Sequence, residues 1–99
     1  MYIVKFTRQA NKDIRAITSY VKDRQFAPIA AKIFLRGIYA RIADLEKNAA
    51  IYAISTYEDV LFYGDNARQI GYKGFVIIYT IHGRFVLVHR IIHGSLIIQ

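Results

Sequence analysis

Two runs of strand-forming residues dominate the C-terminal third of the chain. Phe75–Ile81 and Phe85–Ile92 are dense in Val, Ile, Phe and Tyr, the residue types that suit a pleated, half-buried surface. Between them stands His82-Gly83, and because glycine tolerates positive φ, the pair predicts a two-residue hairpin turn. Arg68–Tyr72 is predicted as a third strand. This third of the chain is therefore expected to form an antiparallel meander.

Counting in steps of two divides the meander into two faces. With the turn at His82-Gly83, one face holds Phe75, Ile77, Tyr79, Ile81, Val86, Val88, Arg90 and Ile92, and the other holds Val76, Ile78, Thr80, Phe85, Leu87, His89, Ile91 and His93. Both faces are apolar, which predicts that both are at least partly covered. The second face carries two histidines and is the better candidate for a functional surface. A one-residue slip in register would exchange the two sets.

The N-terminal half shows helical spacing instead. Tyr2–Phe6 reads as a short first strand, expected to return to the sheet, and Thr7 is a plausible N-cap. An amphipathic helix follows, with a core stripe at Ala10, Ile14, Ile17 and Val21. Gln25–Pro28 breaks the pattern, and Pro28 suits the first turn of a second helix that runs to about Asn48. Its core stripe is Phe34, Ile38, Ile42 and Leu45.

The short connection makes the two helices an antiparallel hairpin. The segment Ala49–Asn66 carries weaker signals and is expected to be a loop with a short strand or a helical turn, closed by the turn residues Gly64-Asp65-Asn66. The predicted fold class is α+β, with the helical hairpin packed on a twisted antiparallel sheet of about four strands. At 99 residues, the chain is expected to be one domain spanning 1–99.

Composition narrows the function classes. Fourteen Lys and Arg against seven Asp and Glu give a formal charge of +7, which suits a polyanionic partner, either nucleic acid or an acidic protein segment. There is no cysteine, so disulfides and thiolate metal sites are excluded, and a reducing cytoplasm is expected. The sequence has neither a run of about 18 apolar residues nor a signal-peptide core, so no membrane association is expected.

Three stretches, together with the order of elements, resemble the RelE/ParE superfamily of toxins from bacterial type II toxin–antitoxin pairs. The first is the helical segment Asp13–Tyr20, an acid followed by apolar residues and then tyrosine. The second is Phe75–Tyr79, an aromatic-x-apolar-apolar-Tyr strand preceded by Arg68. The third is Arg90–Gly94, similar to the Arg-apolar-apolar-His-Gly ending of ParE-like members. The resemblance spans nearly the whole chain and favours the ParE-like branch.

The branches of the superfamily imply different targets. ParE-like members are known as inhibitors of DNA gyrase, and RelE-like members cut mRNA in the ribosomal A site. Both are neutralised by a cognate antitoxin whose flexible segment wraps the toxin. Where RelE itself has an arginine and a late basic residue, this chain has Val76 and Ser95, which argues against a RelE-like nuclease. A third, YafQ-like group of ribosome-dependent nucleases ends in a histidine followed by small residues and Leu, and His93–Leu96 is similar to that ending.

The resemblance implies two sets of site residues. If the chain is an mRNA endoribonuclease, His93 is the general acid and Arg68 contacts the phosphate, with Lys73 or Arg90 as further cations. If it binds gyrase and an antitoxin, the expected contact residues are Lys73, Tyr79, His89, Arg90, Leu96 and Ile97. For Arg90 an ion pair with an acid such as Asp65 or Asp44 is the favoured alternative.

No cofactor and no metal site are expected. Two histidines four residues apart on one strand, His89 and His93, are separated by roughly 13 Å and cannot chelate one ion. His82 is expected to serve the turn. The oligomeric state stays open between a homodimer and a toxin–antitoxin hetero-oligomer.

Overall fold

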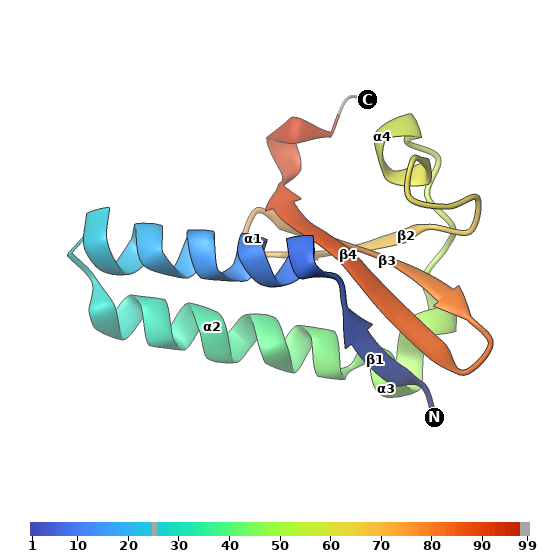
Figure 1. The fold of residues 1–99 in the computed structure, drawn as a ribbon, viewed down its shortest axis with the longest axis horizontal. Helices are drawn as coiled ribbons and strands as arrows, with labels where there is room; N and C mark the ends of the chain where they lie inside the picture. Colours follow the sequence, from blue (N-terminus) through green and yellow to red (C-terminus); the bar gives the residue numbers. More distant parts are fainter. Residues whose placement is uncertain (25, 98–99) are drawn as a thin grey trace.

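A computed structural model describes residues 1–24 and 26–97 of the chain. The elements follow the predicted order: β1 (Ile3–Phe6), α1 (Arg8–Ser19), α2 (Pro28–Ala43), α3 (Leu45–Asn48), α4 (Glu58–Leu61), β2 (Arg68–Tyr72), β3 (Phe75–His82) and β4 (Phe85–His93). Two long helices lie on one side of the sheet, and α4 lies on the other side (Figure 1). The α+β fold class and the helical hairpin are thereby confirmed. No helix within the described residues is long and apolar enough to cross a membrane.

The four strands form one sheet in the order β1-β4-β3-β2. The meander of β2, β3 and β4 is antiparallel, as predicted, and β1 returns to the sheet as expected. However, β1 runs parallel to β4, with Ile3 beside Phe85 and Phe6 beside Val88, so the prediction of a wholly antiparallel sheet was wrong. A strand that reaches the sheet through a helical connection is not bound by hairpin geometry, and can lie parallel to its neighbour.

The β3–β4 turn lies one residue later than predicted. His82 still pairs with Phe85, and the two turn residues are Gly83 and Arg84. Gly83 has φ of +60°, the positive φ expected at the first central position of a hairpin turn of type II′. His82 is therefore a strand residue, and its predicted role in the turn was wrong.

A β-bulge at His89 changes the predicted faces of β4. Ile78 pairs with Arg90 while Tyr79 pairs with Val88, so His89 is the extra residue on β4. The predicted alternation holds up to His89 and is inverted from Arg90 onward. Ile91, expected on the outer face, instead joins the core beneath the helices, whereas Ile92 packs on the outer face.

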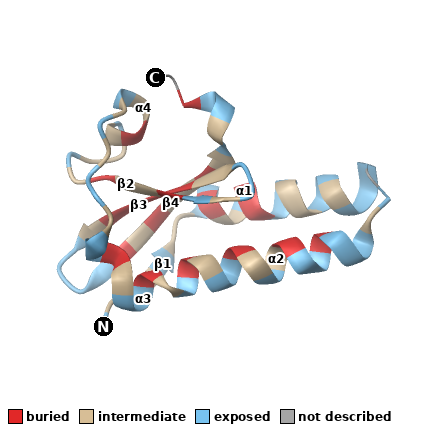
Figure 2. Cartoon of the chain, turned by 180° about the vertical axis from the view of Figure 1, so that it is seen from behind, coloured by how far each residue is buried: buried red, intermediate tan, exposed pale blue. Residues whose placement is uncertain are grey.

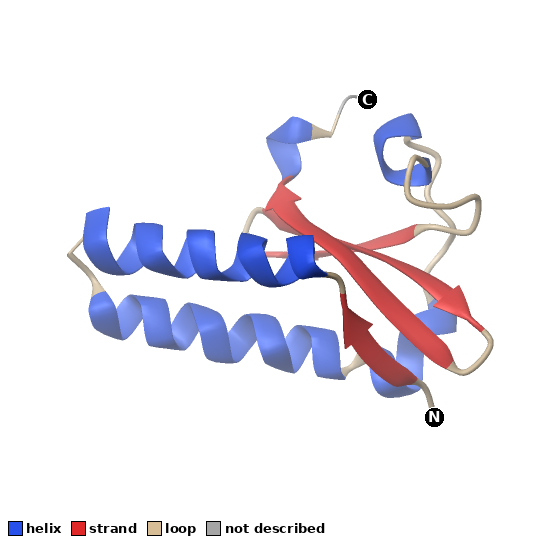
Figure 3. Ribbon diagram, in the orientation of Figure 1, coloured by secondary structure: helices blue, strands red, loops and turns tan. Residues whose placement is uncertain are grey.

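The helical layer begins where the sequence places it. Thr7 caps α1, and its hydroxyl accepts a hydrogen bond of 3.0 Å from the backbone N–H of Ala10. The predicted first helix continues past Ser19 as a π-helical turn, Tyr20–Arg24. The predicted second helix is interrupted at Asp44, which separates α2 from the single turn of α3 (Figure 3).

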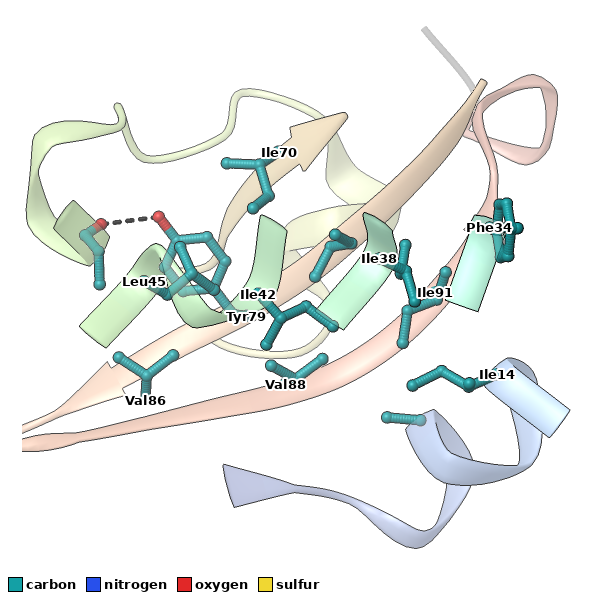
Figure 4. Packing of buried hydrophobic residues seen from close by; sticks show 13 residues of the cluster. Ile14, Phe34, Ile38, Ile42, Leu45, Ile70, Tyr79, Val86, Val88 and Ile91 are labelled. Carbon is teal, nitrogen blue, oxygen red and sulfur yellow. Dashed lines mark hydrogen bonds between the residues drawn. The ribbon is translucent and has the colours of Figure 1, made fainter. Parts of the chain in front are cut away.

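The main core lies between these helices and the inner face of the sheet (Figure 4). The helices contribute Ile14, Phe34, Ile38, Ile42 and Leu45, and the strands contribute Ile70, Ile77, Tyr79, Val86, Val88 and Ile91. Tyr79 is completely buried, and its hydroxyl donates a hydrogen bond of 2.7 Å to the carbonyl of Ala49. Burial raises the pKa of Tyr79 from 10.0 to about 12, so the phenol keeps its proton, and the hydrogen bond, to a higher pH than an exposed tyrosine would.

A smaller cluster covers part of the outer face. Val60 of α4, Ala67 and Ile97 pack on Ile78, with Val76 and Ile92 at the margin. The segment predicted as a loop with a helical turn thus supplies a cover for the β2–β3 half of the sheet. Toward the β3–β4 turn, the outer-face residues His82 and Phe85 are exposed, and Figure 2 shows the turn itself as exposed.

Candidate functional site

His93 lies at the exposed end of β4, where it caps the short 3₁₀ turn Gly94–Leu96. The backbone N–H of Ser95 donates to Nδ1 of His93 over 3.2 Å, and the Ser95 hydroxyl lies 2.7 Å from the same nitrogen. Nδ1 is therefore an acceptor, and the neutral ring carries its proton on Nε2. The ring also packs edge-on against Phe75, with centroids 5.6 Å apart. These contacts give His93 a structural role at the end of the sheet.

Arg90 is bound to an acid of the first helix. Its Nε donates to Asp13 over 2.7 Å, and its Nη2 donates to the same carboxylate over 3.2 Å. The hydrogen bonds to Asp13 raise the pKa of Arg90 above its ordinary value. The prediction that Arg90 forms an ion pair is thus confirmed, but its partner is Asp13 and not Asp65 or Asp44.

Arg68 lies far from His93. It pairs with Tyr79 across the sheet, whereas His93 pairs with Phe75, four residues away along β3. This separation corresponds to roughly 13 Å along the strand. Nε of Arg68 donates to the carbonyl of Tyr52 over 2.7 Å, which fixes the loop after α3 to the edge of the sheet.

The other predicted contact residues differ in exposure. Lys73 is exposed in the β2–β3 turn, with its ammonium 5.6 Å from the ring centroid of Tyr72. Leu96 is exposed, whereas Tyr79 and Ile97 are buried in the two cores. Tyr79 and Ile97 therefore present no surface to a partner in this structure. Leu96 and Ile97 begin an apolar run whose next residue, Ile98, lies outside the described residues.

His89 belongs to a network on the outer face. Its Nε2 lies 2.8 Å from the hydroxyl of Thr80, and Nε2 of His82 lies 2.6 Å from the same oxygen. Thr80 has one hydroxyl proton, so it donates to one imidazole and accepts from the other. Burial and the neighbouring His82 lower the pKa of His89, and its ring packs on Tyr63 with centroids 5.4 Å apart. Within the described residues, no group of three or more His, Cys, Asp or Glu side chains is placed to hold a metal ion.

An apolar groove runs beside α1 and was not predicted from the sequence. It has a volume of about 480 Å³ and is lined by Ala16, Ile17, Tyr20, Val21 and Phe75. Ile17 and Val21 were expected to be core residues, but only the first half of the stripe is buried, because α1 extends beyond the end of the sheet. The sequence feature that could have indicated this groove is the length of the predicted helix, which exceeds that of the strands it packs on.

A second pocket lies on the other flank of α1, where the helix faces α2. Its volume is about 330 Å³, and its floor is formed by Ile14 and Leu35. Arg15 and Lys22 line it together with Thr18, Ser19 and Tyr39. The tip of the hairpin adds exposed apolar side chains, chiefly Phe26, which is 89% exposed, and Ile29. The surface around α1 therefore combines apolar grooves with cations.

Comparison with known proteins identifies the class to which this fold belongs. A solved structure titled the chromosomal ParDE toxin–antitoxin system from P. aeruginosa is similar in fold, with a TM-score of 0.75 over 94% of this chain and 96% of that chain. The two sequences are 23% identical, so this likeness concerns the fold alone. The family described as the ParE toxin of type II toxin–antitoxin systems matches residues 4–97. The chain belongs to this ParE toxin family. No curated protein matches it significantly.

Proposed function

We propose that this chain acts as a toxin by binding and inhibiting DNA gyrase, and that a cognate antitoxin neutralises it. Membership of the ParE toxin family supports the toxin role. ParE-like members of the superfamily are known as gyrase inhibitors, and they act by contact and not by turnover.

One observation favours this proposal over an mRNA endoribonuclease. Cleavage by attack of a 2′-hydroxyl needs a proton donor and cations that converge on one phosphate. Arg90 is bound to Asp13, and Arg68 lies at the far end of β3. Of the three predicted cations, Lys73 alone lies at the His93 end of the sheet within the described residues, exposed in the β2–β3 turn. Of these cations, one is bound to an acid and one is distant from His93, which leaves the single exposed side chain of Lys73 where cleavage needs several groups to converge.

The surface around α1 supports neutralisation by an acidic, amphipathic antitoxin segment. The apolar groove accepts large apolar side chains, and Arg15 and Lys22 on the opposite flank of α1 offer partners for carboxylates. A formal charge of +7 favours encounter with an acidic segment over contact with a second copy of the same chain. This surface is therefore the proposed docking site of the antitoxin.

Two assays on the purified protein test the proposal together. Supercoiling of relaxed plasmid by gyrase should be inhibited, and primer extension on mRNA in translating ribosomes should reveal no cleavage. His93→Ala should retain inhibition, because the proposal gives this histidine no catalytic role. Cleaved mRNA with normal supercoiling would instead establish the nuclease, and His93→Ala should then abolish the cutting.

A further inference from the structure

The sheet carries no acidic side chain. All seven Asp and Glu residues lie between positions 13 and 65, in the helices and the connecting loops. The strands and their two turns carry only basic charges, from Lys5, Arg68, Lys73, Arg84 and Arg90. Of these, Arg90 alone is paired with an acid among the described residues. The sheet is therefore free of negative charge, whereas the helical part of the chain mixes charges of both signs.

Part of the outer face of this sheet has no cover from residues 1–24 and 26–97. α4 and the segment that ends at Ile97 pack over Ile78 and its neighbours, while Gly64 lies against Thr80. Beyond them, toward the β3–β4 turn, five neighbouring side chains point to the same side: Ile3, Lys5, His82, Phe85 and Leu87. Ile3 is 47% exposed and Phe85 is 39% exposed. We refer to these five residues together with Arg84 as the open sheet face.

The open sheet face interleaves rings with cations. Phe85 is the cross-strand partner of His82 on one side and of Ile3 on the other. The ammonium of Lys5 lies 4.9 Å from the ring centroid of Phe85, and Arg84 is exposed immediately before it. A sheet face with exposed rings beside basic side chains is the arrangement by which several single-strand binders hold bases and phosphates.

We propose that the open sheet face binds single-stranded nucleic acid without sequence preference. Bases would stack on Phe85 and His82, and Lys5 and Arg84 would contact the phosphates. A single strand fits better than a duplex, because stacking on an exposed ring needs an unpaired, exposed base. It also fits better than an acidic protein segment, which would leave the rings without a stacking partner. This activity uses a different surface from the groove beside α1 and does not depend on gyrase inhibition.

Fluorescence anisotropy of a labelled twelve-nucleotide oligo(dT) tests the proposal. The whole chain should bind it at low salt, with affinity that falls as salt rises. Phe85→Ala should weaken binding by about tenfold, consistent with the loss of one stacked base. Phe62→Ala removes an exposed phenylalanine at the C-terminal end of α4, outside the open sheet face, and should leave binding unchanged. Lys5→Ala should lower the slope of log affinity against log salt by about 0.7, the value for one phosphate contact.

Two further measurements separate stacking from charge alone. Phe85→Tyr keeps the ring and should retain binding, which guards against an effect of Phe85→Ala on folding. Polyglutamate should compete with oligo(dT) far less well than unlabelled oligo(dT) does. The proposal fails if no binding is detected at low salt, if polyglutamate or duplex DNA competes equally, or if Phe85→Ala binds as the unmodified chain does. Each result is independent of the supercoiling assay, so the two proposals can fail separately.

Discussion

The carboxylate of Asp13 on α1 binds the guanidinium of Arg90 on β4 through hydrogen bonds of 2.7 and 3.2 Å. The same carboxylate accepts a hydrogen bond of 3.0 Å from the backbone N–H of Ile91. β1 pairs with β4 only as far as Val88, and no strand of the part of the chain that the structure describes continues along this edge of β4. Side chains provide the hydrogen-bond partners that a strand would otherwise provide. Asp13 accepts from the N–H of Ile91, and the Thr7 hydroxyl donates to the carbonyl of His89 over 2.9 Å. Beyond Val88, α1 therefore lies along the edge of β4 that β1 covers up to that residue.

Replacement of Asp13 should therefore destabilise the fold. Asp13→Asn keeps the size of the side chain but removes the charge opposite Arg90 and offers one acceptor oxygen in place of two. Because Arg90 is partly exposed to water, we expect a loss of about 1–3 kcal/mol in the free energy of unfolding. Urea denaturation measures it.

A double-mutant cycle identifies the source of this loss. Arg90→Met alone and Asp13→Asn alone should each destabilise the chain, and the double variant should lose less than the sum of the two. Additive losses would mean that the pair does not interact in solution. Gln9→Ala is a milder control, because Gln9 makes one hydrogen bond of 3.0 Å to the same carboxylate at the surface of α1.

The fold was largely predictable from the sequence because its periodicities are strong. The residues that the alternation along β3 and the apolar stripe of α2 assign to the core are buried in the structure, for example Ile77 and Ile38. The bulge at His89 was not predictable, because one extra residue leaves no mark in an apolar strand that alternates on both sides of it. The partner of Arg90 was missed for a different reason: Asp13 lies 77 residues away and meets β4 only once the helix lies along the sheet edge. The groove beside α1 likewise depends on how far the helix extends past the strands.

Gly37 allows Tyr72 to cross α2. A Cβ at position 37 would lie only 1.7 Å from the hydroxyl oxygen of Tyr72 and 2.5 Å from the ring carbon that bears it. In most helix interiors a change from glycine to alanine stabilises by about 1 kcal/mol. Gly37→Ala should instead destabilise by about 1–3 kcal/mol, because the ring must move away from Phe34. Thermal denaturation measures the change.

The matched background for this test is Tyr72→Leu, which removes the ring. In that background Gly37→Ala should be neutral or stabilising, since only the helix propensity of alanine is left. If Gly37→Ala destabilises equally in both backgrounds, the contact with Tyr72 is not the cause.

His89 should make stability depend on pH on the acid side of neutrality. Its pKa is lowered from 6.5 by burial and by His82, so the unfolded chain takes up this proton at a higher pH than the folded chain. The stability contributed by the neutral ring is therefore fully present above pH 6.5 and is lost as the pH falls below it. Urea denaturation between pH 5 and pH 8 should show this decline, and His89→Gln should flatten it.

The control for the pH dependence is the exposed histidine at the end of the sheet. His93→Gln should leave the shape of the stability profile between pH 5 and pH 8 unchanged, because His93 lies outside the network around Thr80. If the decline in stability persists in His89→Gln and disappears in His93→Gln, the acid sensitivity comes from His93 and the prediction for His89 is wrong.

The groove beside α1 gives a direct test of the proposed antitoxin surface. Ala16 is an exposed helix residue that lines the groove, so Ala16→Glu places a negative charge there without disturbing the core. An acidic antitoxin segment should then bind at least tenfold more weakly, because like charges meet at an otherwise apolar contact. Ala40→Glu makes the same change at an exposed position of α2 outside the groove and should bind the antitoxin as the unmodified chain does.

Titration calorimetry measures both affinities, and growth during co-expression provides the functional readout. Ala16→Glu should escape neutralisation and stay toxic, whereas Ala40→Glu should be neutralised. Equal affinities for the two variants would place the antitoxin elsewhere on the toxin.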